Sequence, residues 1–162
     1  MDIPYFEDES FLSRIDQLIN KYHFQKGFLR FEFGERDIAN NFELIKALSK
    51  KITNLDIYLT ADNYTGAFVS IDKLKQVGFK IVKLSRNLIM DLANDGTKIN
   101  GVKSIMQDIK EYDMSYCIVG LETKLQYQLL SEIDKDFLVE GYYFYQPMDI
   151  DELLSRLKLM AA

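Results

Sequence analysis

The chain contains one cysteine, Cys117, and one histidine, His23, among its 162 residues. It cannot form an internal disulfide, and Cys/His zinc sites, Cys–His dyads and Ser-His-Asp triads lack the residues they need. Cys117 lies in an apolar stretch and is expected to be a small core residue. His23 follows a helical segment, where a packing or capping role is expected. Any chemistry in this protein must therefore come from carboxylates and lysine.

Long apolar runs and an excess of positive charge are also missing. No run approaches the roughly 20 apolar residues of a membrane span, and the N-terminus is acidic where a secretory signal is basic. The 20 basic and 25 acidic residues give a net charge of −5, without a basic stripe. Dinucleotide-binding and P-loop glycine patterns are absent. We therefore expect a cytoplasmic protein with neither a nucleic-acid nor a membrane partner.

Apolar residues make up 48% of the chain, and there are only two prolines and eight glycines. This composition is typical of one compact domain over residues 1–162. Apolar periodicity predicts helices over residues 10–22, 38–51, 70–76, 99–109 and 125–133, and a last helix begins after Pro147, at the Asp149/Glu152 capping spacing. Apolar runs of residues that favour β-strands predict strands over residues 28–33, 55–60, 79–84, 115–120 and 137–144. The order of these elements indicates an α/β fold.

Five strands that alternate with helices predict a parallel sheet, either an open doubly wound sheet or part of a TIM-type barrel. In both folds, ligands bind beyond the carboxyl ends of the strands. The charged residues at those ends are Glu32, Asp62, Lys83, Glu122 and Glu140. Carboxylates gathered at one rim are suited to a divalent cation such as Mg²⁺ or Mn²⁺, whereas acidic residues at loop ends also commonly cap helices.

Five motifs follow one another in a specific order. They are Glu32-x-x-Glu35, Ala61-Asp62-Asn63-Tyr64-Thr65-Gly66, Val82-Lys83-Leu84-Ser85-Arg86, Val119-Gly120-Leu121-Glu122-Thr123 and Glu140-Gly141-Tyr142-Tyr143. In order and spacing, this set resembles the EAL domains, TIM-barrel phosphodiesterases that open cyclic di-GMP. The resemblance implies a partial (β/α) barrel of about five parallel strands.

The resemblance also implies roles for single residues. Glu32 matches a metal-binding glutamate, and Asp62 matches the second aspartate of the family's D-D-F-G-T-G motif. Lys83 matches the lysine that orders the attacking water. Glu122 matches the second glutamate of the A-E-G-V-E-T motif, and Glu140 stands where the family has a glutamine.

Three departures from the family pattern bear on catalysis. Ala61 replaces the aspartate that bridges two metal ions, Val119 replaces a metal-site glutamate, and the glutamate of the E-A-L signature has no counterpart. A complete barrel takes about 250 residues, so this chain supplies roughly its last two-thirds. We expect a catalytically inactive, truncated domain that has lost the Mg²⁺ or Mn²⁺ of the family, with Lys83 and Glu122 as vestiges and Glu32 and Asp62 as weak metal candidates.

The expected function is a regulatory or protein-interaction module in bacterial signalling. One alternative is a receptor that binds cyclic di-GMP without hydrolysis, through Lys83, Arg86, Tyr142 and Tyr143. Another is a phosphodiesterase completed by a second chain. Unpaired sheet edges predict a homodimer, with residues 28–33 or the N-terminal segment at the contact, unless the helix over residues 11–22 covers the open end.

Overall fold

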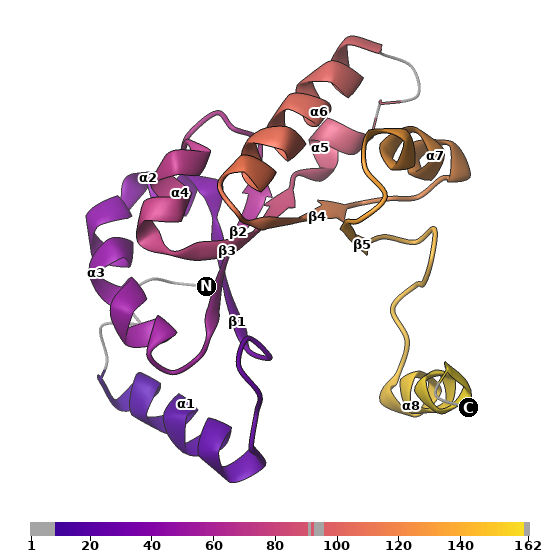
Figure 1. The fold of residues 1–162 in the computed structure, drawn as a ribbon. Coiled ribbons are helices and arrows are strands. Elements are labelled where there is room, and N and C mark those ends of the chain that lie inside the picture. The colour runs from indigo at the N-terminus through magenta and orange to yellow at the C-terminus, as the bar shows by residue number, and fades with distance from the viewer. Residues whose placement is uncertain (1–8, 91, 93–95, 161–162) are drawn as a thin grey trace.

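A computed structural model describes residues 9–90, 92 and 96–160 of the chain. Strands and helices alternate along it (Figure 1). The elements are α1 (Glu9–Tyr22), β1 (Arg30–Gly34), α2 (Glu35–Asn40), α3 (Phe42–Thr53), β2 (Tyr58–Tyr64), α4 (Ile71–Val77), β3 (Phe79–Leu84), α5 (Arg86–Ile89), α6 (Gly96–Glu111), β4 (Ser115–Val119), α7 (Lys124–Ile133), β5 (Leu138–Glu140) and α8 (Ile150–Met160).

The five strands form one sheet in the order β1-β2-β3-β4-β5, and every neighbouring pair is parallel. A doubly wound sheet reverses its strand order at a switch point, whereas successive strands of a barrel lie side by side. The sheet bends, with α2 to α7 along its outer side (Figure 1). The predicted partial barrel is confirmed, and the doubly wound alternative is wrong.

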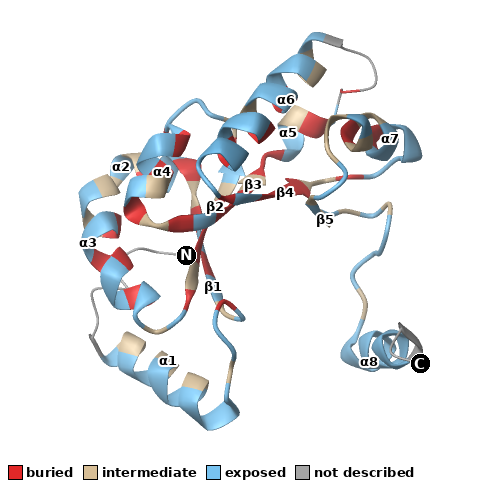
Figure 2. Ribbon diagram, in the orientation of Figure 1, coloured by how far each residue is buried: buried red, intermediate tan, exposed pale blue. Residues whose placement is uncertain are grey.

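The hydrophobic core lies between the sheet and the outer helices, where buried residues concentrate (Figure 2). Phe33 of β1 and Phe79 of β3 pack edge to face there, with their ring centroids 6.3 Å apart. Side chains alternate across a strand, so residues on either side of a core residue point to the opposite, inner face. In β1 this alternation buries Phe31 and Phe33 and leaves Glu32 exposed on the inner face.

Side-chain caps fix where several helices begin. The Ser70 side chain caps α4, and Thr123 and Gln126 form a complete capping box at α7. The predicted start of α8 is confirmed, because Asp149 Oδ1 accepts a hydrogen bond of 2.8 Å from the Glu152 amide. Each cap satisfies amide groups that the first helical turn leaves without a partner.

Some predicted boundaries differ from the structure. The predicted helix over residues 38–51 is two helices, because Asn41 leaves the helical conformation at φ −128°. Its main-chain amide still donates to the Asp37 carbonyl, as the last hydrogen bond of α2. The second strand runs over 58–64 rather than 55–60. The fifth ends at Glu140 rather than 144, because the chain turns there and the Tyr143 amide donates to the Leu121 carbonyl.

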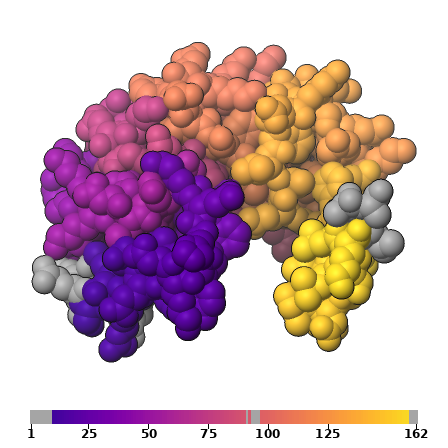
Figure 3. All heavy atoms as spheres, turned by 60° about the horizontal axis from the view of Figure 1, so that its bottom comes forward, coloured from indigo at the N-terminus to yellow at the C-terminus, as the bar shows by residue number. Residues whose placement is uncertain are grey.

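Helices α1 and α8 lie on the two sides of the opening on the inner side of the sheet (Figure 3). Helix α1 packs onto the sheet, with the Phe11 ring 6.2 Å from that of Phe31. Within the described residues, no helix is both long and apolar enough to cross a membrane. The N-terminal segment named above as a dimer contact lies outside the described residues, apart from its end at Glu9.

Candidate functional site

The side chain of Lys83 lies at the centre of the inner face, between two carboxylates. Its Nζ is 3.1 Å from Glu32 Oε2 and 3.0 Å from Glu140 Oε2. Glu32 belongs to β1 and Glu140 to β5, the two outermost strands. In a flat sheet, strands four positions apart would be about 19 Å from one another. That one amine reaches both carboxylates shows how strongly the sheet curves.

The charge state of Lys83 follows from these contacts. Its side chain is 12% exposed. Burial alone lowers the pKa of a lysine, but hydrogen bonds and opposite charge from Glu140 and Glu32 outweigh burial and raise the pKa of Lys83 above its usual value. The lysine is therefore an ammonium ion at neutral pH, and its positive charge occupies the space between the two carboxylates.

Ala61 and Val119, where the resemblance implies acidic residues, have different surroundings. Val119 is in register with Glu140, so its side chain shares the inner face with the carboxylate of Glu140. Ala61 is in register with Phe33 and is fully buried in the hydrophobic core. Neither side chain has an atom that can bind a metal ion. Within the described residues, no group of three or more His, Cys, Asp or Glu side chains is arranged to hold one.

Two further predicted site residues form a second ion pair. Arg86 Nη2, at the start of α5, is 2.6 Å from Glu122 Oε1 in the loop before α7. Gly120 makes this approach possible: it has φ +81°, and a β-carbon at residue 120 would overlap the Arg86 side chain. Both charged side chains are about half exposed, so the pair lies at the solvent-facing side of the site.

The remaining predicted residues lie close to these pairs along the chain. Asp62 is in register with Gly34 at the carboxyl end of β2 and is partly buried. Tyr142 is 61% exposed two residues after Glu140, whereas the neighbouring Tyr143 stacks on Tyr127 with 5.6 Å between their ring centroids. Of the two tyrosines, Tyr142 presents its ring to solvent.

Glu35 holds the loop between β2 and α4, although sequence reasoning gave it no role of its own. Its side chain is buried, and its two oxygens accept hydrogen bonds from the Thr65 amide and hydroxyl and from the amides of Phe68 and Val69, at 2.7 to 3.3 Å. The sequence signal that could have drawn attention to Glu35 was the E-x-x-E motif, because it places a second carboxylate directly after the strand. Hydrophobic periodicity carries no information about such an anchor.

Sequence reasoning assigned no role to Ser85 either. It is buried at the end of β3, and its hydroxyl donates a 2.6 Å hydrogen bond to Asn63 Oδ1 at the end of β2. The two residues line a polar hollow of about 410 Å³, together with Glu35, Arg36 and Asn87 among others. The carboxyl ends of β1 to β3 therefore form a concave, hydrogen-bonded surface next to the Lys83 ion pairs.

Cys117 is buried beside this site, in register with Lys83. Burial and the negative charge of Glu140 raise the pKa of its thiol to about 12. A nucleophilic thiolate is therefore not available near neutral pH, which agrees with the expected core role.

Comparison with known proteins places this geometry in a family. The family described as "EAL domain" matches residues 3–147. The cyclic di-GMP phosphodiesterase NbdA of Pseudomonas aeruginosa is 24% identical over 126 residues, 78% of this chain and 16% of that protein. The signaling protein YkoW of Bacillus subtilis is 23% identical over 143 residues, 88% of this chain and 18% of that protein.

A solved structure shows the same fold. The PaMucR phosphodiesterase in complex with c-di-GMP superposes with a TM-score of 0.83 at 16% sequence identity, over 94% of this chain and 62% of that one. The chain thus spans less than a fifth of the two curated relatives and less than two-thirds of this solved structure. From the matched motifs, the curved parallel sheet and these relatives, we conclude that the chain belongs to the EAL domain family.

Proposed function

We propose that this chain is a non-hydrolytic EAL domain, a regulatory or protein-interaction module in bacterial cyclic di-GMP signalling. The observation that carries the proposal is that Lys83, which matches the family's water-ordering lysine, is bonded to both Glu32 and Glu140, and that Glu140 stands where the family resemblance implies a glutamine. A divalent ion at the same place would have to compete with the charge of the ammonium group. The family and its named relatives supply the link to cyclic di-GMP.

The absence of metal-binding side chains at two positions supports the same proposal. Two-metal hydrolysis uses one ion to generate a hydroxide and both ions to stabilise the displaced oxygens. Ala61 and Val119 remove two of the carboxylates that the family resemblance implies, and Val119 leaves an apolar group on the inner face beside Glu140. Ligands that act as a unit are commonly worth orders of magnitude in rate, so their joint loss is expected to abolish turnover.

Binding of cyclic di-GMP without hydrolysis is the second candidate function. Arg86 is a half-exposed cation at the site, and the Tyr142 ring is mostly exposed nearby in the chain. A guanidinium group suits a phosphate, and an exposed aromatic ring suits stacking with a purine base. This candidate shares the first one's prediction of no turnover but differs in predicting a measurable affinity.

Two measurements on the intact chain test these candidates. The first is an assay for linear dinucleotide formation from cyclic di-GMP with Mg²⁺ or Mn²⁺, in which we expect no product. Turnover that Lys83→Ala or Glu32→Ala abolishes would overturn the proposal and favour a phosphodiesterase completed by another copy of the chain. The second is calorimetric titration with cyclic di-GMP: heat that Arg86→Ala removes identifies a receptor, and no heat at high micromolar ligand leaves the protein-interaction module.

A further inference from the structure

Lys83 and Arg86 are the two cations among the predicted site residues, and carboxylates hold both of them. Lys83 is bonded to two carboxylates, and its side chain is only 12% exposed. Arg86 is bonded to one carboxylate, that of Glu122, and its side chain is 55% exposed. A ligand with a phosphate group would have to displace two partners from Lys83 but only one from Arg86. Arg86 is therefore the cation that such a ligand can reach, and Glu122 is the group that already occupies it.

A buried glutamine, Gln126 of α7, ties the loop that carries Glu122 to the helix that carries Arg86. Its Oε1 accepts hydrogen bonds of 3.0 Å from the amides of Glu122 and Thr123, and its Nε2 donates to the Ile89 carbonyl at 3.3 Å. Ile89 ends α5, which lies beside the start of α7 (Figure 1). The main chains at residues 86 and 122 are thus held together, and only the ends of the two side chains have to move for the ion pair to open.

The ion pair of Arg86 and Glu122 contributes little to the stability of the fold, because both charged groups are about half exposed. A carboxylate and a phosphate diester each carry one negative charge, and both accept hydrogen bonds from guanidinium donors. Glu122 therefore presents to Arg86 the same chemistry that the phosphate of a ligand would present.

We propose that Glu122 is an internal competitor of phosphate at Arg86, and that it thereby sets the affinity of this site for ligands that carry a phosphate group. A phosphate must break the bond between Glu122 and the guanidinium before it binds, so the observed affinity is lower than the affinity of the free cation. For cyclic di-GMP the competition rests on the receptor proposed above as the second candidate function, whereas for inorganic phosphate it rests on Arg86 alone.

Calorimetric titration of the full chain with cyclic di-GMP measures this competition. Glu122→Gln keeps the shape of the side chain and should raise the affinity about fivefold, because the exposed ion pair no longer has to be broken. Glu122→Ala, which removes the hydrogen-bond acceptor as well, should raise the affinity at least as much.

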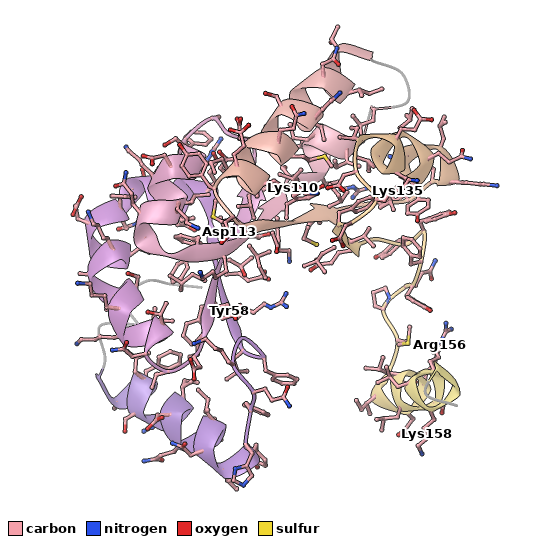
Figure 4. All side chains as sticks on the ribbon, viewed as in Figure 1. Tyr58, Lys110, Asp113, Lys135, Arg156 and Lys158 are labelled. Carbon is pink, nitrogen blue, oxygen red and sulfur yellow. The ribbon has the colours of Figure 1, made fainter. Side chains whose placement is uncertain are left out.

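The ion pair of Lys110 and Asp134 provides the control. It lies at the amino end of β4, where α6 turns into the sheet (Figure 4), whereas Glu122 follows the carboxyl end of that strand. Asp134→Asn also removes one negative charge and leaves a half-exposed cation without its partner, and it should leave the affinity for cyclic di-GMP unchanged. Circular dichroism checks that every variant stays folded.

Inorganic phosphate tests Arg86 without the nucleotide. The side-chain Nε–H resonance of Arg86 is assigned by its absence in Arg86→Ala. It should shift at lower phosphate concentrations in Glu122→Gln than in the parent, by about the same factor as the gain in affinity for the nucleotide.

The two titrations separate the competition from the receptor itself. Equal affinities for cyclic di-GMP in the parent and in Glu122→Gln, both lost in Arg86→Ala, would overturn the competition and leave the receptor. No heat from the nucleotide in either protein would overturn the receptor, and the phosphate titration alone would then decide on the competition. Equal phosphate dependence of the Arg86 resonance in the parent and in Glu122→Gln, or an equal gain in affinity in Asp134→Asn, would also overturn the competition.

Discussion

The α-carbon of Gly141 lies directly against the main chain of Leu121, so that a β-carbon at residue 141 would overlap the Leu121 carbonyl oxygen. The same carbonyl accepts the Tyr143 amide at 3.0 Å, and the Glu140 carbonyl accepts the amides of Gly120 and Leu121. This close approach joins the end of β5 to the loop after β4. It thereby fixes Glu140 where it can reach Lys83.

Gly141→Ala should therefore destabilise the domain by about 2 kcal/mol or more, because the backbone must move to admit the methyl group. Denaturant unfolding followed by circular dichroism measures the loss. Gly101→Ala in α6 is the matched control, since a β-carbon there meets nothing within 4 Å and helix propensity favours alanine by about 0.8 kcal/mol. Equal effects at the two glycines would contradict the account of this contact.

Glu35→Gln should loosen the loop between β2 and α4. The amide of glutamine turns two donor hydrogens toward groups that are themselves donors, with an expected cost of about 2 kcal/mol. Hydrogen exchange should accelerate at the Phe68 and Val69 amides, which bond to Glu35 Oε1. Glu43→Gln at the exposed start of α3 serves as the control, and unchanged protection of both amides would count against the anchor.

Replacing Lys83 should create a cation site from the two carboxylates it now neutralises. In Lys83→Met the side chains of Glu32 and Glu140 lose their shared cation, which should cost about 2 kcal/mol of stability. Mn²⁺ should then raise the melting temperature of the variant and leave that of the parent unchanged. Lys80→Met on the same strand should behave like the parent. Equal stabilisation of the parent by Mn²⁺ would show that Lys83 does not exclude the ion.

Asp134 should make the stability of the domain depend on pH in the acid range. Burial raises the pKa of its carboxyl, but hydrogen bonds from Lys110, Tyr116 and the Asp136 amide outweigh burial and lower it from 3.8 to about 2. The stabilisation is thus complete above the unfolded-state pKa and is lost as the pH falls through about 2.

Asp134→Asn should accordingly cost about 1 to 2 kcal/mol at neutral pH, and the difference from the parent should shrink between about pH 4 and pH 2. Urea unfolding at several pH values measures it. Glu132→Gln on α7 removes the same charge from an exposed position and should give a small, flat difference. If the loss of stability in Asp134→Asn stayed constant over this whole pH range, the loss would not come from the ionised carboxylate, and the account of Asp134 would be wrong.

Local sequence patterns predicted the helices and strands well where apolar periodicity or a capping residue marks them. The core helices and the capping spacing at Asp149 follow from side chains within a few residues of one another. The predicted helix across Asn41 was wrong because apolar spacing continues through a residue whose backbone leaves the helix. The fifth strand was overextended because exposed aromatics after Glu140 imitate strand composition while Gly141 turns the chain.

The sequence by itself determined the family of this protein, the alternation of its strands and helices, and the identity of the groups at the strand ends, including Ala61 and Val119 where the family resemblance implies acidic residues. Only the tertiary structure decided that Lys83 bonds to Glu32, 51 residues away, and to Glu140, and that Glu35 anchors a loop rather than facing the Lys83 site. The physical reason is that these contacts depend on strand register and sheet curvature. Both arise from hydrogen bonding between segments far apart in the chain, which no local pattern records.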